Sequence, residues 1–512
     1  MTRSRKFLGG VLMSYGHQAL VVIAGLWLTP FFLRHIGQHD YGLWLVGTQL
    51  LTYLTLTDLG VVALVPLETA YATGRAGGAG NAKDLPQIVG QTTRLMLYQL
   101  PLVALVAVGM WLTIPAEWQG LRGPLAIVLI GFVVTFPLRM LPALLHGLQD
   151  LSFAGAITAI NWILSTGVSA AMVAAGWSLY ALAVGWLLSQ TVTIPFVVYR
   201  LLTRFPGVLP RRLPPETWSA TKTRLGKGFW VSVAQVAQLL MNNTDLLILG
   251  RLLGPAAVVP YSCTGKLAGV LANQMGILMQ SATPGLCELK TGESRQKLFQ
   301  VLVALTHGIL TFSGLVFCAV ILVNKWFVTW WVTGHQYGGF ALTVVLLVTM
   351  LVRHWATITA YSVFCFGYQR RISLTNLADG LVTAGGCWVL TMVWGPIGAP
   401  MGSIAGACLV SLPWNLWIIA RDTDSSVTKL VTAMLGSWFW RFIVPAGLAL
   451  WVAWRWTPAN LIQAGLATLA ISAVYIAVMF PNVMRSPLGD YLRQLLVAFR
   501  GKYAALQIRF SS

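Results

Sequence analysis

The stretch VSVAQVAQLLMNNTDLLILGRLLG, Val231–Gly254, carries two glutamines, two asparagines and an aspartate inside an otherwise apolar run. At about 100° per residue on a helix, four of its polar side chains share one face: Gln235, Gln238, Asn242 and Asp245. Lipid offers these groups no hydrogen-bond partner, and an ionised aspartate at mid-membrane costs about 2.5 kcal/mol or more. We therefore expect this face to point at a water-filled cavity, with hydrogen bonding between helices as the alternative.

The rest of the chain has the composition of a polytopic membrane protein. Of its 512 residues, 57% are hydrophobic and only 9% are charged, and the mean hydropathy is +0.73. Apolar runs recur that are long enough to cross a hydrocarbon core of about 30 Å as helices. The fold class is thus an all-α polytopic membrane protein with about 14 transmembrane helices. The predicted spans are 8–33, 41–65, 95–114, 123–146, 153–175, 179–200, 229–250, 257–281, 298–323, 339–364, 374–394, 398–420, 438–456 and 460–480.

The basic residues predict the orientation of the chain in the membrane. The net charge is +20, but these residues lie in short loops between spans, which argues against nucleic acid as a partner. The loops predicted on the outer side hold only five of them: Arg34, Arg122, Arg251, Lys325 and Arg455. The positive-inside rule therefore predicts that both termini are cytoplasmic.

A weak internal repeat predicts two halves of parallel orientation. RHIG at Arg34 and RLLG at Arg251 follow the first and seventh spans, and HGLQD at His146 and FGYQR at Phe366 close the fourth and tenth. Copies six spans apart are related by an axis along the membrane normal. We predict six-helix bundles over 1–200 and 229–420, a cytoplasmic linker over 201–228, two additional helices over 421–480 and a basic amphipathic tail on the inner membrane surface over 481–512.

Charged residues inside or beside the spans are the candidate site residues. Arg34, Arg251, Lys266 and Arg353, with the amides Gln235, Gln238 and Asn242, suit an anionic substrate, since arginine grips phosphate bidentately. The alternative is that the intramembrane cations pair with acids such as Asp245 or Asp379. Asp58 is interpreted as the cap of a helix break before Gly60 or as a coupling group, and Arg139 as an entry group or an anchor. His17, His307 and His354 are the candidate histidines for proton transfer, with a hydrogen-bonded helix contact as the alternative.

Enzyme chemistry has little support in this sequence. The cysteines show no paired spacing, no His-Cys-Asp cluster has metal-ligand spacing, and no glycine-rich phosphate loop follows a strand. We therefore expect no enzymatic activity, no metal and no cofactor.

Three stretches resemble the polysaccharide-transporter, or Wzx-type, family of the superfamily that also contains MATE multidrug transporters and the lipid II flippase. They are LTPFFLRHIGQHDYGLW with LTDLG, then NNTDLLILGRLLGPAAVVPYSCTGKL, and VWGPIGAPMGS. The resemblance implies a flippase for undecaprenyl-diphosphate-linked oligosaccharide, an O-antigen or exopolysaccharide repeat unit, in the bacterial inner membrane. It implies alternating access between two bundles and a coupling gradient of H⁺ or Na⁺.

Carried onto this sequence, the resemblance makes Asp245 the acid for coupling or for substrate contact. Asp58, Asp379 and His354 are further candidates for ion coupling. It makes Arg251, Lys266 and Arg353 the candidate ligands for the diphosphate or for an acidic sugar. Membrane lipids and a polysaccharide polymerase are the other expected partners. The competing interpretation is a MATE-like antiporter that exports cationic drugs, which would need an acidic cavity.

Overall fold

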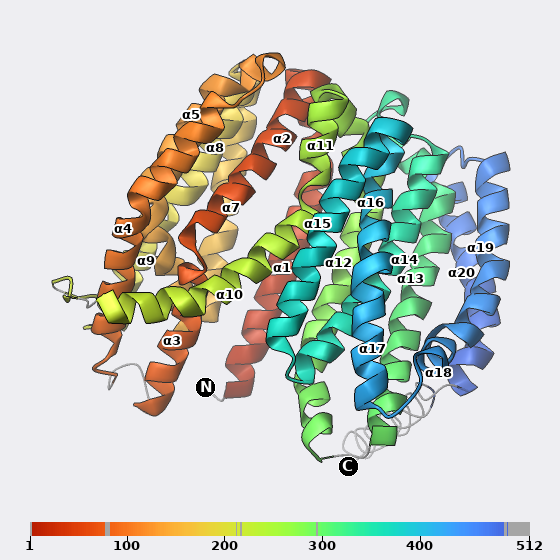
Figure 1. The fold of residues 1–512 in the computed structure, drawn as a ribbon. Helices are drawn as coiled ribbons and strands as arrows, with labels where there is room; N and C mark the ends of the chain where they lie inside the picture. Colours follow the sequence, from red (N-terminus) through yellow and green to blue (C-terminus); the bar gives the residue numbers. More distant parts are fainter. Residues whose placement is uncertain are drawn as a thin grey trace, which may run out of the picture. The chain divides into compact units, whose positions relative to one another are not determined.

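The computed structural model describes residues 3–76, 82–210, 212–215, 218–292, 295–485 and 489. Every regular element in these ranges is helical (Figure 1). Within them, nine helical segments are long and apolar enough to span a membrane, or ten if one bent pair counts as a single span. The predicted fold class, an all-α polytopic membrane protein, is confirmed, and the number fourteen stays a prediction.

The chain divides into two compact units, Met1–Val259 and Pro260–Ser512. The helices of the first unit are α1 Arg3–Ile36, α2 Gln38–Leu54, η1 Thr55–Asp58, α3 Val61–Arg75, α4 Leu85–Leu112, η3 Ala116–Trp118, α5 Gln119–Thr135, η4 Phe136–Arg139, α6 Met140–Gly147, α7 Leu151–Ala174, α8 Ser178–Thr191, α9 Thr193–Arg204, α10 Trp218–Asn242 and α11 Asp245–Leu252. Helix α12, Pro255–Gly292, begins in this unit and continues into the second.

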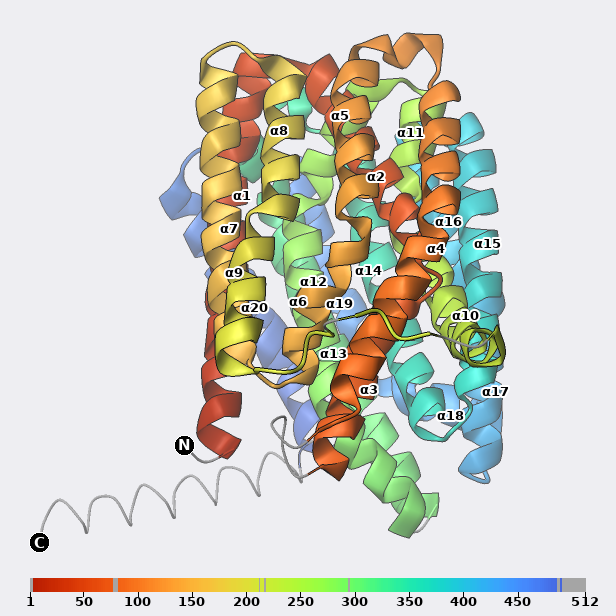
Figure 2. The same ribbon diagram turned by 90° about the vertical axis from the view of Figure 1, so that its left-hand side faces the viewer.

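Prolines explain two interruptions in the first unit. Pro137 lies in η4, between α5 and α6, and Pro195 lies in the first turn of α9. A proline has no backbone N–H to donate to the carbonyl four residues before it, so the helix loosens there. Figure 2 shows the two interrupted pairs, α5 above α6 and α8 above α9. Helix α5 packs on α8 and α6 on α9, so the two interruptions belong to one packed layer.

The second unit is built around the long helix α13, Arg295–Trp331. It continues with η5 Gly334–Gln336, α14 Phe340–Cys365, α15 Gln369–Trp394, η6 Gly395–Ile397, α16 Gly398–Gly406, η7 Ala407–Ser411, α17 Leu412–Asp422, α18 Val427–Val431, η8 Thr432–Gly436, α19 Ser437–Arg455 and α20 Leu461–Arg485. Helix α13 packs against α14, α19 and α20. Its apolar side chains, with Phe442 of α19 and Tyr475 of α20, form a buried core.

Close backbone packing joins α15 to α16. A Cβ atom at Gly402 would collide with the backbone of Cys387. Small residues at such positions let membrane helices approach closely, where van der Waals contact replaces the missing hydrophobic drive. The VWGPIGAPMGS stretch therefore forms a tight helical hairpin with the preceding span.

The structure corrects two predicted boundaries. The predicted linker 201–228 is shorter, because α9 runs to Arg204 and α10 begins at Trp218. The predicted single span 229–250 is divided into α10 and α11. Helix α20 reaches Arg485, and the rest of the predicted tail 481–512 lies outside the described residues except residue 489. The assignment of the bundles as domains stays a prediction.

Candidate functional site

Asp58 caps a sharp break in the second span. Helix α2 with η1 and helix α3 meet at 53°, and Leu59 and Gly60 between them have left-handed φ angles of 50° and 73°. The Asp58 carboxylate accepts a hydrogen bond of 2.8 Å from the Gly60 N–H. This confirms the predicted capping role, since a short acidic side chain satisfies a backbone donor that the break leaves open. Asp58 itself is buried.

A second break divides the polar stretch Val231–Gly254. Asn243 and Thr244 separate α10 from α11, and the Thr244 hydroxyl donates to the Leu240 carbonyl at 3.0 Å. Asp245 is the first residue of α11, where its carboxylate accepts from the Leu246 N–H at 2.9 Å. Side chains of this kind compete with the helix for backbone groups. The expectation of one continuous polar face that includes Asp245 is therefore wrong, because that face ends at Asn242.

Three of the four residues predicted to share a polar face, Gln235, Gln238 and Asn242, remain together on α10. Asn242 donates to the backbone carbonyl and to the side-chain oxygen of Gln238, both at 3.0 Å, and both residues are exposed. Gln235, one turn earlier, is half-buried, and its side-chain oxygen has no hydrogen-bond partner among the described residues. The carboxyl-terminal half of α10 thus presents open amide groups.

The two interrupted helix pairs, α2–α3 and α10–α11, contact each other at two points. The Tyr53 hydroxyl, in the last turn of α2, lies 2.5 Å from the Thr244 hydroxyl. Helix α10 also crosses the Asp58 break, where Gly228 packs against the Leu59 carbonyl so closely that a Cβ atom would collide with it. Figure 1 shows α10 lying obliquely across the junction of α2 and α3. A movement of either interrupted helix pair should therefore move the other.

An ion pair fixes the beginning of α10 on its own unit. Arg224 lies 3.5 Å from the Glu68 carboxylate of α3 and donates to the Gln91 amide oxygen of α4 at 3.1 Å. This basic residue was predicted to lie in the cytoplasmic linker. Its partner on α3 was not predicted.

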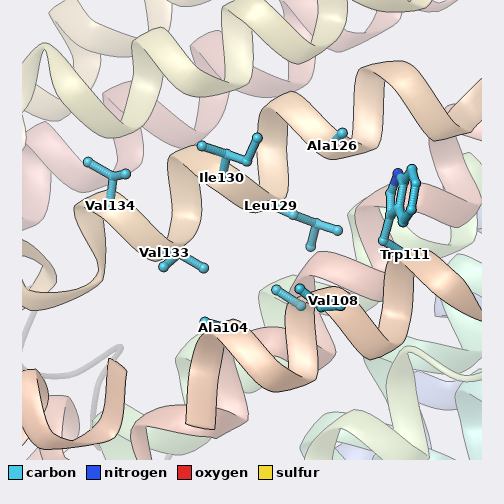
Figure 3. Close-up of a pocket in the computed structure, with 9 residues that line it drawn as sticks. Ala104, Val108, Trp111, Ala126, Leu129, Ile130, Val133 and Val134 are labelled. Atoms are coloured by element: carbon cyan, nitrogen blue, oxygen red, sulfur yellow. The ribbon is translucent and has the colours of Figure 1, made fainter. Parts of the chain in front are cut away.

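An apolar groove lies between α4 and α5 (Figure 3). Its volume is about 440 Å³, and its walls are alanines and larger apolar residues, from Trp111 and Ala126 at one end to Ala104 and Val134 at the other. No charged side chain lines it. It can hold hydrocarbon, and it offers nothing to a sugar or a phosphate.

In the second unit, the structure brings together Arg353 and Asp379. The Arg353 guanidinium of α14 donates to both Asp379 oxygens of α15, at 2.8 and 3.0 Å. It also donates to the hydroxyls of Ser403 at 2.7 Å and Thr383 at 2.6 Å. The Asp379 side chain is fully buried and that of Arg353 is 15% exposed. The fork geometry of this bond is typical of strong, charge-assisted pairs.

Hydroxyl groups complete the coordination of Asp379. Thr383 donates to one carboxylate oxygen at 2.9 Å, and Ser411 donates to the other. Ser411 ends η7, a turn of π-helix just before Pro413, which cannot donate to the carbonyl four residues earlier. A glycine is needed at position 406, because a Cβ atom at Gly406 would collide with the Asp379 carboxylate. Four hydrogen bonds from side chains thus hold the Asp379 carboxylate.

The other predicted site residues are not among the hydrogen-bond partners of Arg353 and Asp379 in the described residues. His354 shares a hydrogen bond of 2.6 Å with the Ser313 hydroxyl of α13. Lys266 of α12 is half-buried, and no carboxylate among the described residues lies within 4.0 Å of it. Arg34 and Arg251 are exposed in the last turns of α1 and α11, positions from which long basic side chains reach the interface.

Sequence reasoning missed the hydroxyl partners Thr383, Ser403 and Ser411. One signal was available, because Thr383 lies four residues after Asp379 and hence on the same helix face. The other two come from a helix whose π turn changes the register, which a periodicity of 3.6 does not predict.

The described units therefore combine helices long and apolar enough to span a membrane with one bent helix pair and a buried ion pair. Residues 103–340 match a family described as "Polysaccharide biosynthesis protein". No curated protein matches the chain.

Solved structures of a flippase and of multidrug transporters have folds similar to that of this chain. The structure entitled "Lipid II flippase MurJ, inward closed conformation" has 11% identity and a TM-score of 0.65, over 93% of this chain and 100% of that one. An inward-facing MATE family multidrug transporter has 14% identity and a TM-score of 0.53, over 78% and 94%. Its outward-facing counterpart has 15% identity and a TM-score of 0.51, over 81% and 96%. The fold likeness and the family match confirm the predicted resemblance to the polysaccharide-transporter branch.

Proposed function

We propose that this protein is a flippase that moves an undecaprenyl-diphosphate-linked oligosaccharide from the cytoplasmic to the outer leaflet by alternating access. The family match over residues 103–340 is the observation that carries the proposal. The fold shared with the lipid II flippase supports it. Sugar hydroxyls lose their water in hydrocarbon without replacement, so a translocation path needs amides such as those of Gln235, Gln238 and Asn242.

Lys266 is the strongest of the proposed diphosphate ligands. The Arg353 guanidinium donates its hydrogen bonds to Asp379 and to two hydroxyls, so it binds substrate only if its pair with Asp379 opens. Lys266 has no such partner among the described residues, and an ammonium is a mobile point charge that suits a flexible diphosphate. Arg34 and Arg251 are exposed at helix ends, where they would act on substrate entering or leaving the membrane.

For gradient coupling we propose Asp245, with Asp58 as a second acid. Both lie where a helix pair is interrupted, and the two pairs, α2–α3 and α10–α11, contact each other through Tyr53 and Thr244. A change of protonation or ion binding at either acid would therefore act on both spans. Asp379 is less suited, because breaking its pair with Arg353 would leave two buried charges unpaired. His354 is engaged by Ser313.

A gene deletion tests the proposal. Cells that lack the protein should accumulate a lipid-linked oligosaccharide and lose the corresponding surface glycan, and the intact gene should restore both. Reporter fusions at each terminus would check the proposed inner-membrane topology, with both ends cytoplasmic.

The same deletion strain distinguishes the flippase from the competing proposal of a MATE-like drug antiporter, which the fold also supports. Changed tolerance of cationic drugs with normal surface glycan would favour the antiporter. Unchanged drug tolerance with loss of glycan would favour the flippase.

A further inference from the structure

Arg139, the last residue of η4, is half-buried, and its guanidinium has no hydrogen-bond partner among the described residues. Its Nη1 atom is shielded from the surroundings and unpaired, and its guanidinium lies 5.0 Å from the centre of the Phe132 ring. Asp58 acts on it electrostatically, but no described carboxylate comes within 4.0 Å. A buried cation left with unfilled donors is costly. The buried guanidinium of Arg353, by contrast, donates to Asp379 and to the hydroxyls of Ser403 and Thr383.

A cavity of about 160 Å³ adjoins Arg139. Three more polar residues line it, Thr135 from α5, Gln190 from α8 and Thr193 from α9, and Leu138 lies at its rim, 38% exposed. The cavity lies where both helix pairs of this layer are interrupted, at Pro137 and Pro195. A water molecule takes about 30 Å³ in the liquid, so the space holds several waters or one anion of phosphate size.

The chemistry of this lining favours an anion. Arg139 offers five N–H donors in a planar fork that fits two oxygens of one phosphate. Gln190 uses one amide donor on the Ser189 hydroxyl at 3.2 Å, which leaves the second for a ligand. Thr193 adds a hydroxyl. No described carboxylate lines the cavity.

We propose that the Arg139 cavity is a binding site for a phosphate or diphosphate group, with Arg139 as its cationic ligand and Gln190 and Thr193 as neutral donors. The site goes beyond the proposed transport function, because it binds its anion at equilibrium whether or not the protein moves a lipid. The group can be borne by a lipid or be free in water. The apolar groove of Figure 3 ends at Val134, one turn before Leu138 at the cavity rim, so a prenyl-linked form belongs among the probes.

Binding to the purified full-length protein in an uncharged detergent tests the proposal. The probes are inorganic diphosphate, farnesyl diphosphate and farnesol, titrated at low ionic strength, where screening is weak. We expect saturable binding of at least one diphosphate probe and at least tenfold weaker binding of it by Arg139→Gln. Arg455→Gln, which removes one exposed arginine of the second unit, should bind like the wild type.

Leu138→Trp is the second variant, because it fills the cavity from its rim and leaves Arg139 in place. It should also weaken binding, and it decides the question alone if Arg139→Gln does not fold. Binding of both diphosphates assigns the site to the free anion, and binding of farnesyl diphosphate alone assigns it to a lipid head group. Equal affinities of the wild type and the folded variants, or equal affinities for farnesol and farnesyl diphosphate, would overturn the proposal. Neither result bears on glycan export, which the deletion strain reports separately.

Discussion

Replacing Asp379 by alanine removes the carboxylate that neutralises Arg353 inside the second unit. The carboxylate is fully buried, and the guanidinium, 15% exposed, would keep only the hydroxyls of Ser403 and Thr383. Removing one member of a buried ion pair costs about 3–5 kcal/mol, because the other charge stays buried without a partner. Since 1 kcal/mol shifts Tm by about 2–4 °C in a domain of about 150–250 residues, we expect Tm to fall by on the order of 10 °C.

The assay is thermal unfolding of the purified full-length protein, followed by tryptophan fluorescence at one fixed scan rate. Asp150→Ala is the matched control, because it breaks the ion pair between Asp150 and Arg200. The Arg200 side chain is 33% exposed and the Asp150 side chain is 16% exposed. Such pairs contribute about 0–1 kcal/mol, so Tm should change little.

The double variant Arg353→Met with Asp379→Leu should recover most of the loss, since an apolar pair of similar volume replaces the two charges. The reasoning is refuted if Asp379→Ala unfolds like the wild type, or if the double variant is less stable than the single one.

Further outcomes follow from the first unit and from α12. Gly228→Ala should destabilise the protein by about 1–3 kcal/mol, because the new Cβ collides with the Leu59 carbonyl. Gly226→Ala, on the same helix with nothing near the new Cβ, should stabilise the protein by about 0.5–1 kcal/mol. Equal Tm values for the two variants would contradict the close packing of α10 against Leu59. Asp245→Asn should abolish gradient-dependent translocation at wild-type expression, and normal surface glycan would count against it. Asp58→Asn still accepts the Gly60 N–H, so its free energy of unfolding should stay within about 1 kcal/mol of the wild type while transport falls. A large drop in Tm would show instead that the charge itself stabilises the break. Lys266→Ala should weaken binding of the lipid-linked sugar more than it lowers Tm, and wild-type affinity would reject Lys266 as a ligand.

The sequence predicted the helical class and the position of most helices because long apolar runs have one stable solution in lipid. It also predicted the break at Asp58, since an acid two residues before a glycine has an obvious backbone partner. The repeat landmarks Arg34 and Arg251 lie in the last turns of α1 and α11, as expected. These features depend on neighbours within a few residues.

The features that the sequence did not predict depend on register or on distant partners. A spacing of 100° per residue places Asp245 on the polar face of α10 only if the helix is unbroken. In the structure, α10 ends before Asn243 and Thr244. The pairing of Arg353 with Asp379 was only one of two alternatives, since the sequence does not say which faces of α14 and α15 meet. The Arg139 cavity arises where Pro137 and Pro195 interrupt two packed helix pairs, a coincidence in space.

The most direct test of the central claim is translocation by the purified protein in liposomes. An undecaprenyl-diphosphate-linked oligosaccharide with a fluorescent sugar would be placed in both leaflets, and an impermeant quencher would report the fraction that stays protected. With an imposed ion gradient, we predict that the protected fraction changes in vesicles that contain the protein and stays constant in those with Asp245→Asn or with no protein. An unchanged fraction in the presence of active, folded protein, with gradient-driven uptake of a cationic drug instead, would contradict the flippase account.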